Sequence, residues 1–133
     1  MTKKILVTGS AGHLGEALVR TLRDGDTIVV GTDISPSSYT DRVGSIVDPD
    51  HVRRCMVGVD AVVHTATLHK PHVATHRRQE FVDTNITGTL NLLEEATLAG
   101  VDAFVFTSTT STFGDALTPS PDEPAAWITE DVE

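Results

Sequence analysis

Three glycines spaced three residues apart follow a short apolar run near the start of the chain. The run is Ile5–Val7, and the glycines are Gly9, Gly12 and Gly15. This spacing indicates a β-strand that turns sharply into an α-helix. Glycine can turn the chain, let another group approach the backbone, and let the helix pack on the strand without an intervening side chain. A chain that begins in this way is expected to fold as an α/β domain.

Short apolar runs recur along the chain and alternate with segments of helical periodicity. The runs are Ile5–Val7, Ile28–Val30, Ser45–Val47, Ala61–Val63 and Ala103–Phe106. Spacings of three and four place Leu14, Leu18 and Leu22 on one helical face, and Phe81, Asn85, Gly88, Leu92 and Ala96 on another. This alternation predicts a Rossmann-like, doubly wound parallel sheet with the strand order 3-2-1-4-5 and a ligand crevice between strands 1 and 4.

Residues that favour helix ends indicate where the predicted helices begin and end. Gly25 and Gly100 each precede a predicted strand, and we expect both to end a helix with a positive φ angle. Asp50, directly after Pro49, is expected to cap the short helix that follows it. We expect residues 1–133 to form one domain, without the further strands and the separate substrate domain of a complete enzyme.

The composition narrows the function classes. Ten Lys and Arg residues against 19 Asp and Glu residues give a formal net charge of -9, so a nucleic-acid partner is not expected. No apolar run approaches the roughly 20 residues of a membrane helix, and the start of the chain has no signal-peptide core. We therefore expect no membrane partner and a cytoplasmic location. The single cysteine, Cys55, cannot form an internal disulfide and is expected to be buried rather than reactive.

The glycine segment also indicates a ligand. A helix that begins at such a loop presents its amino end to phosphate groups, as in dinucleotide-binding domains. Asp33 follows the second predicted strand, about 20 residues beyond the loop, where a carboxylate can accept hydrogen bonds from both hydroxyls of the adenosine ribose. It would repel a 2′-phosphate, so NAD is favoured over NADP. An aspartate at this position could instead only stabilise a turn through hydrogen bonds to the backbone. Asp48 could likewise reach the adenine or, with Pro49, simply start a helix.

Four segments of the chain, in order, resemble motifs of one enzyme family. Thr8–Gly15 resembles TGxxGxxG, and Asp60–Ala66 resembles DxVxHxA. Asn85–Ala96 resembles NxxGTxNLLEAA, and Phe104–Gly114 resembles FVFxSSxxxYG. The chain therefore resembles the extended short-chain dehydrogenase/reductase family, the NAD-dependent epimerases and dehydratases that act mainly on nucleotide sugars.

The resemblance implies a role for each matching residue. The cofactor-binding residues would be Gly9, Gly12, His13, Leu14, Gly15, Asp33, Asp48, Thr65, Ala66, Thr67, Asn85 and Thr107. The glycine loop would bind the pyrophosphate, Asp33 the ribose and Asp48 the adenine, while residues 65–67 would line the nicotinamide side. Asn85 would support the central helix or a proton-relay water, and Thr109 would be the catalytic hydroxyl that polarises the substrate oxygen. Residues 108–111 could instead be a polar strand end that caps the next turn.

A catalytic pair of that family has no counterpart in this sequence. The family uses a tyrosine whose pKa is lowered by a lysine four residues later, whereas the one tyrosine here, Tyr39, is followed at that spacing by Val43. Residues 127–131 resemble the acidic loop before the family's catalytic helix, so we expect the chain to stop short of that helix. The fifth strand, with Phe104 and Phe106, would then be an open sheet edge at which two copies could pair as a homodimer.

Three functions follow from these observations. The first is the N-terminal part of an NAD-dependent oxidoreductase, epimerase or dehydratase that transfers hydride from a carbinol, with a nucleotide sugar as the expected small-molecule substrate. The second is a non-catalytic module that binds NAD or uses the open sheet edge for a partner. The third is a transition-metal site that would use His64, His69, His72 and His76. We assign no metal ligand, because His64 belongs to the fourth-strand motif and the other three could contact substrate phosphates when protonated.

Overall fold

Five parallel strands form the centre of the molecule. The computed structural model describes residues 2–109, 113–114, 118–125, 127 and 129. Its strands are β1 (Lys4–Thr8), β2 (Ile28–Asp33), β3 (Arg42–Val43), β4 (Ala61–His64) and β5 (Ala103–Phe106). They lie in the order β3-β2-β1-β4-β5, as the sequence predicts. The strand order therefore reverses between β1 and β4, which is the position at which open α/β sheets bind ligands.

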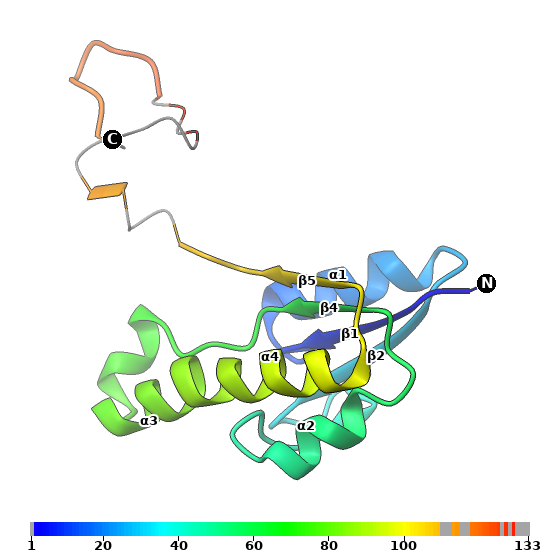
Figure 1. Cartoon of the computed structure of the whole chain (residues 1–133). Coiled ribbons are helices and arrows are strands. Elements are labelled where there is room, and N and C mark those ends of the chain that lie inside the picture. Colours follow the sequence, from blue (N-terminus) through cyan, green and yellow to red (C-terminus); the bar gives the residue numbers. More distant parts are fainter. Residues whose placement is uncertain (1, 110–112, 115–117, 126, 128, 130–133) are drawn as a thin grey trace.

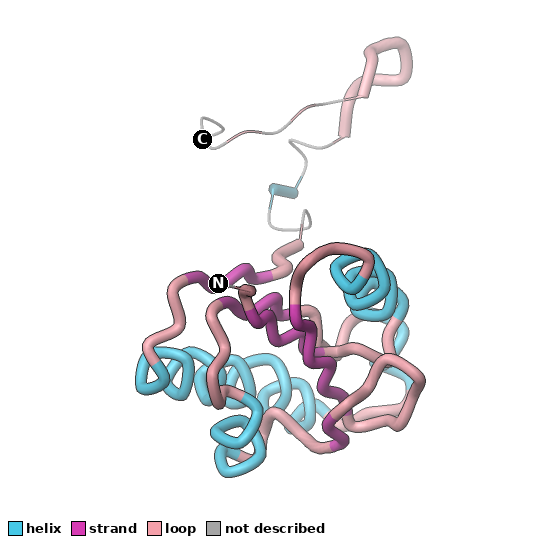
Figure 2. The backbone as a smooth tube through the Cα atoms, turned by 90° about the vertical axis from the view of Figure 1, so that its right-hand side faces the viewer, coloured by secondary structure: helices cyan, strands magenta, loops and turns pink. Residues whose placement is uncertain are grey.

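Helices cover both faces of this sheet. They are α1 (His13–Arg23), α2 (Pro49–Cys55), the 3-10 helix η1 (Lys70–Ala74), α3 (Arg78–Val82), the π-helical turn η2 (Asp83–Thr87) and α4 (Gly88–Ala99). Figure 1 shows α1 on one face and α2 with α4 on the other, and Figure 2 shows the sheet end-on between them. Because α3, η2 and α4 follow one another without a break, they form one long helical segment.

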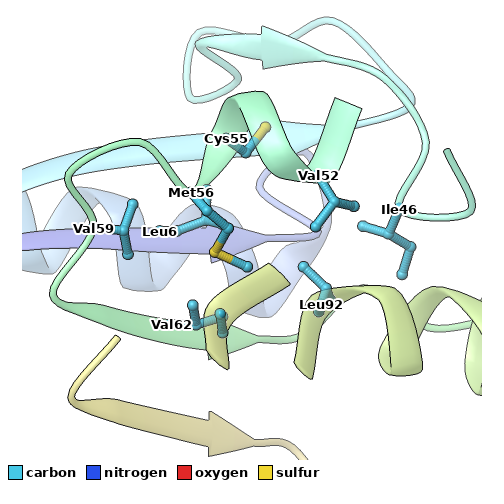
Figure 3. Close-up of a cluster of buried hydrophobic side chains, with 9 residues drawn as sticks. Leu6, Ile46, Val52, Cys55, Met56, Val59, Val62 and Leu92 are labelled. Atoms are coloured by element: carbon cyan, nitrogen blue, oxygen red, sulfur yellow. The ribbon is translucent and has the colours of Figure 1, made fainter. Parts of the chain in front are cut away.

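The main hydrophobic core lies between the sheet and the pair of helices α2 and α4. Figure 3 shows Leu6 and Val62 of the sheet packed with Val52 of α2, with Met56 directly after α2, and with Leu92 of α4. All five side chains are at most 1% exposed. Burying one such side chain stabilises a protein by about 1.5 to 3 kcal/mol, so this cluster holds both helices firmly on the sheet.

A smaller cluster holds α1 on the opposite face. Val19 of α1 is fully buried against two valines of the sheet. Of the predicted face Leu14, Leu18 and Leu22, only the last two pack against this cluster, and Leu14 is 49% exposed. All three leucines lie in α1, as predicted, but in its first turn Gly15 rather than Leu14 is buried.

The third strand lies earlier than predicted. The sequence predicts it at Ser45–Val47, whereas β3 is Arg42–Val43, paired with the end of β2. Ile46 is buried, but in the main core rather than in the sheet. Its carbonyl and that of Val47 accept hydrogen bonds from Asn91 Nδ2, each 3.0 Å long. A side chain of α4 thus replaces a neighbouring strand as the partner of this backbone.

Two of the predicted helix ends are wrong. Gly100 ends α4 with a φ of 70°, as predicted, but Gly25 has no positive φ, and α1 ends at a residue with a φ of -72°. The cap of α2 is Asp48, not Asp50, because Asp48 Oδ1 accepts a hydrogen bond from the Asp50 amide at 2.9 Å. Pro49 occupies the first helical position and so places Asp50 inside the first turn.

The strand β5 is an edge of the described sheet, as predicted. Val105 and Phe106 are each 55% exposed, whereas Phe104 packs against the main core. Pairing of two copies at this edge stays a prediction. Among the described residues, every helix is too short or too polar to cross a membrane.

Asn91→Leu is expected to lower the free energy of unfolding by about 1 to 3 kcal/mol, because two backbone carbonyls lose their donor in a partly buried place. Urea denaturation followed by circular dichroism measures this change. Glu94→Leu, at an exposed position of the same helix, is the matched control and should stay within about 0.5 kcal/mol of the wild type. Equal losses in the two variants would contradict the role given to the Asn91 amide.

Candidate cofactor site at the carboxyl edge of the sheet

A tight turn between β1 and α1 is built from Gly9, Gly12 and Gly15. Gly9 has a φ of +73°, and a Cβ there would come within 2.8 Å of the Ala66 amide nitrogen. A Cβ on Gly15 would overlap the carbonyl oxygen of Gly9, so α1 can approach the loop only without a side chain at this position. Gly9 therefore turns the chain and Gly15 packs the helix, as predicted, whereas contact of Gly12 with a phosphate stays a prediction.

The amino end of α1 is open to an anionic ligand. Gly12 is the N-cap residue, and a glycine has no side chain that could cap the first amides of α1. The next two residues, His13 and Leu14, are exposed. The first amides of a helix are hydrogen-bond donors without partners inside the helix, and they carry partial positive charge. A phosphate group therefore fits this position.

Asp33, the last residue of β2, is bonded to the glycine loop. Its Oδ2 accepts a hydrogen bond from the Ala11 amide at 3.0 Å, and its Oδ1 accepts one from the Ser35 amide at 2.9 Å. Each carboxylate oxygen has two lone pairs, so both oxygens can accept a further hydrogen bond. The carboxylate is thus fixed beside the loop, at the position predicted for a ribose ligand.

Asp48 starts a helix, which is one of the two roles that the sequence allows. It caps α2, and the bond to the Asp50 amide uses only one of its carboxylate oxygens. Contact with an adenine group stays a prediction, and the cap does not exclude it.

The side chain of Thr8 joins the ends of β1 and β4. Its Oγ1 accepts hydrogen bonds from the amides of Thr65 and Ala66, each at 3.2 Å. In return, Thr65 Oγ1 donates to the Thr8 carbonyl at 2.7 Å. The predicted nicotinamide-side residues Thr65 and Ala66 therefore lie directly beside the glycine loop, and the exposed Thr67 follows them.

His64 extends this contact to the long helical segment. Its Nδ1 lies 2.7 Å from Thr8 Oγ1, and its Nε2 lies 3.0 Å from Thr89 Oγ1. Since Thr8 Oγ1 already accepts from two amides, its own hydrogen is directed to Nδ1, and Nε2 carries the ring hydrogen. Thr89 Oγ1 then donates to the Asn85 carbonyl at 2.8 Å. Burial lowers the pKa of His64 to about 4, so the ring is neutral at pH 7.

Asn85 fixes the loop that follows β4. Its Oδ1 accepts from the Leu68 amide at 2.8 Å and from Thr67 Oγ1 at 3.1 Å, and its Nδ2 donates to the Leu68 carbonyl at 2.8 Å. Asn85 therefore supports the junction between this loop and the helical segment. A role with a proton-relay water stays a prediction.

Thr107 and Thr109 follow β5 at the same edge of the sheet. The Thr107 amide donates to the His64 carbonyl at 3.1 Å, which extends the pairing of β5 with β4 by one residue. Thr109 is exposed two residues later. Its catalytic role stays a prediction, and residues 110 and 111 of the alternative polar strand end, 108–111, lie outside the described residues.

The histidines of the alternative metal site have other contacts. His64 is hydrogen-bonded at both ring nitrogens, so neither nitrogen is available to a metal ion. Within the described ranges, no group of three or more His, Cys, Asp or Glu side chains could hold a metal ion.

Cys55 is buried, as the sequence predicts. It is 2% exposed, and burial raises the pKa of its thiol. Its Sγ lies 3.5 Å from Nε2 of His51, a second buried histidine, whose pKa burial lowers. A reactive thiolate does not fit these surroundings.

Two residues of this site are missing from the sequence-based set. Thr8 and Thr89 each contribute a hydroxyl group to the bonds around His64. Both stand inside the quoted motifs, directly before Gly9 and four residues after Asn85. Only their positions within the motifs could have pointed to these two threonines, because spacing in the sequence does not show which side chain a hydroxyl will contact.

As the pH falls, the His64→Gln variant is expected to lose less stability than the wild type. The folded-state pKa of about 4 lies below the ordinary value of 6.5, so the unfolded state takes up this proton first, and stability falls as the pH drops from 6.5 toward 4. Between pH 7 and pH 5 this contribution amounts to about 2 kcal/mol. Urea denaturation at both pH values measures it.

Thr89→Val is the control for this prediction, because it removes a bond to His64 but keeps the titrating ring. It should lower stability at pH 7 and retain most of the wild-type pH dependence. The same pH dependence in wild type and His64→Gln would show that His64 is not the titrating group.

Known proteins match both the sequence and the structure of this chain. Residues 5–129 match the model of the NAD dependent epimerase/dehydratase family. The UDP-glucose 4-epimerase of Erwinia amylovora is 35% identical over an alignment of 133 positions that covers 86% of this chain and 40% of that protein. The 3 beta-hydroxysteroid dehydrogenase/Delta 5→4-isomerase of Mycobacterium tuberculosis is 36% identical over an alignment of 118 positions that covers 81% of this chain and 32% of that protein.

A solved structure shares the fold. The crystal structure of a short-chain dehydrogenase/reductase superfamily protein from Agrobacterium tumefaciens with bound NAD is 33% identical to this chain. It superposes with a TM-score of 0.77 and covers 95% of this chain and 40% of that one. The chain thus spans about two fifths or less of the length of the relatives that it matches. The matched residues include the glycine loop and all five strands, and the chain belongs to the NAD dependent epimerase/dehydratase family.

Proposed function

We propose that residues 1–133 form an NAD-binding domain of an oxidoreductase, epimerase or dehydratase that acts on a carbinol. The observation that carries this proposal is the Asp33 carboxylate, held by the Ala11 amide of the glycine loop at the end of β2. In this place a carboxylate suits a ribose diol and opposes a 2′-phosphate, which favours NAD over NADP. Family membership supports the same cofactor.

The proposed roles follow the geometry of the carboxyl edge. The turn at Gly9 and Gly12 and the amino end of α1, with His13 and Leu14, would bind the pyrophosphate, and Gly15 lets the helix come close. Asp33 would accept hydrogen bonds from the ribose, and Asp48 one from the adenine. The other proposed cofactor residues are Thr65, Ala66, Thr67, Asn85 and Thr107.

When bound, NAD supplies the acceptor for a hydride that leaves the carbinol carbon of the substrate. The hydroxyl of Thr109 would donate a hydrogen bond to the carbinol oxygen and so increase its polarity. The carbinol proton must pass to a base, and Tyr39 is unsuited to this task. Its ring packs partly buried against the cluster that holds α1, and no lysine follows it at the family's spacing.

The relatives offer two classes of substrate. One relative is named for UDP-glucose and another for a hydroxysteroid. We propose a nucleotide sugar, in line with the motif resemblance. A second candidate function is a binding module without catalysis, which would use the exposed edge strand β5 for a partner.

Asp33→Ala is expected to weaken NAD binding by about 1 to 3 kcal/mol, the range for losing hydrogen bonds to a charged group, and to reduce the preference for NAD over NADP. Titration calorimetry with each cofactor measures both effects. Asp26→Ala, an exposed carboxylate in the turn before β2, is the matched control and should change neither. Unchanged affinity and unchanged selectivity in Asp33→Ala would refute the ribose assignment.

The 133-residue chain alone is expected to show no more than trace oxidoreductase turnover, because it lacks a tyrosine whose pKa a neighbouring lysine lowers. Absorbance at the NADH band measures net oxidation of UDP-glucose. Chromatography of the nucleotide sugars measures epimerisation or dehydration, in which NAD is reduced only transiently, and NAD titration on the same sample measures binding. Tight NAD binding without turnover agrees with the proposal. Rapid NADH formation would contradict the expected need for that tyrosine.

A further inference from the structure

His51 of α2 is a buried histidine whose ring is hydrogen-bonded to the sheet. The residue is 6% exposed, and its Nε2 lies 2.8 Å from Thr32 Oγ1. The Thr32 hydroxyl donates to the Arg42 carbonyl at 2.9 Å, so its oxygen accepts from His51 and the ring hydrogen is on Nε2. Burial lowers the pKa of His51, so the neutral ring is the main form at pH 7. One chain of hydrogen bonds therefore joins α2, β2 and β3.

The same ring lies against Gly44, the residue directly after β3. A Cβ on Gly44 would overlap Nδ1 of His51 and come within 2.5 Å of Cε1 and 2.7 Å of Cγ. Gly44 has no positive φ angle, so its backbone conformation would allow another residue. The need for a glycine at this position therefore comes from direct contact with the His51 ring.

Both contacts of His51 lead to Asp33, the proposed ribose ligand. Thr32, whose hydroxyl accepts from His51, is the residue before Asp33 in β2. Gly44, which lies against the ring, donates its amide hydrogen to the Asp33 carbonyl at 2.9 Å. His51 therefore supports Asp33 from two directions, through its own strand and through the end of the neighbouring strand.

The strand β3 gains little support from its own side chains. It has two residues, both exposed, and lies at an edge of the described sheet with β2 as its neighbour. Exposed side chains contribute little to stability through burial, so the position of β3 depends on its hydrogen bonds and on His51. Asp41 bonds to the Gly31 backbone at the start of β3. His51 acts at the other end, beside Asp33.

We propose that His51 is a positioning residue of the cofactor site and holds the Asp33 carboxylate at the place where it meets the adenosine ribose. This inference rests on the proposed function. His51 does not contact the ligand and acts through Thr32 and Gly44. A carboxylate that bonds to two ribose hydroxyls must be placed accurately, because hydrogen bonds weaken steeply when their angles are poor. Loss of the ring therefore reduces both the affinity for NAD and the preference for NAD over NADP.

The test is a double-mutant cycle between His51 and Asp33, measured by calorimetric titration of the 133-residue chain with NAD and with NADP. His51→Ala alone is expected to weaken NAD binding by a factor of about three to ten, as is usual within one hydrogen-bond network, and by no more than Asp33→Ala does. It should also reduce the preference for NAD. In the Asp33→Ala background the same substitution should cost no further affinity, because no carboxylate is left to position. An equal loss in both backgrounds would overturn the proposal.

Two further variants separate positioning from a loss of stability. Val52→Ala truncates the next residue of α2, which is buried in the main core. It should lower the free energy of unfolding in urea but leave the affinity for NAD within about twofold of the wild type. Gly44→Ala should weaken NAD binding while the His51 ring is present, and much less in the His51→Ala background. The proposal is wrong if Val52→Ala loses as much affinity as His51→Ala, or if Gly44→Ala costs the same with and without the ring.

Amide hydrogen exchange followed by NMR separates this inference from the proposed function, because it needs no cofactor. The Ala11 amide donates to Asp33 Oδ2, and the Gly44 amide donates to the Asp33 carbonyl. Relative to the Leu6 amide in β1, both should exchange faster in His51→Ala but not in Val52→Ala. If the wild type fails to bind NAD, the proposed function is wrong, and these exchange rates still decide whether His51 positions Asp33. Unchanged relative rates in His51→Ala would contradict that role.

Discussion

The hydroxyl of Thr8 connects the two central strands at the place where both end. It is fully buried, accepts hydrogen bonds from the Thr65 and Ala66 amides, and donates to His64. Without it, two partly buried amides and one buried ring nitrogen would lose their partner, and a buried polar group without a partner costs about 1 to 3 kcal/mol. Gly9 is close to the same residues, since a Cβ on Gly9 would come within 2.8 Å of the Ala66 nitrogen. The shape of the carboxyl edge thus depends on one threonine side chain.

Two loops begin beside Thr8, and a different side chain holds each of them. The glycine loop is held by the Asp33 carboxylate, which bonds to the Ala11 amide. The loop after β4 is held by Asn85, which bonds to both backbone groups of Leu68. Asn85 stands in the π-helical turn η2, and the Thr89 hydroxyl ties its carbonyl to His64. The π-helical turn therefore joins the helix that covers the main core to the loop that follows β4.

The order of the strands could be predicted from the sequence, but the position of the third strand could not. Short apolar runs mark buried backbone, and four of the five runs lie in strands. Ile46 is equally apolar and is 6% exposed, yet its backbone partner is the Asn91 side chain, which is 45 residues away in the chain. Local patterns also do not show which residue ends a helix, as Gly25 and the pair Asp48 and Asp50 illustrate. For the site, the glycine geometry could be predicted, whereas the bonds of Thr8 and Thr89 depend on how separate elements pack.

The two interpretations of Asp33 that the sequence allows are not alternatives. A turn aspartate accepts hydrogen bonds from nearby amides, and Asp33 does so with the Ser35 amide. A ribose ligand needs a carboxylate held still before the sugar arrives, since ordering a side chain on binding costs free energy. The bonds to Ser35 and Ala11 hold the carboxylate in this way and use only one lone pair on each oxygen. The turn thus prepares the carboxylate for the proposed ligand, and for this reason a substitution of Asp33 should be judged by cofactor selectivity rather than by affinity alone.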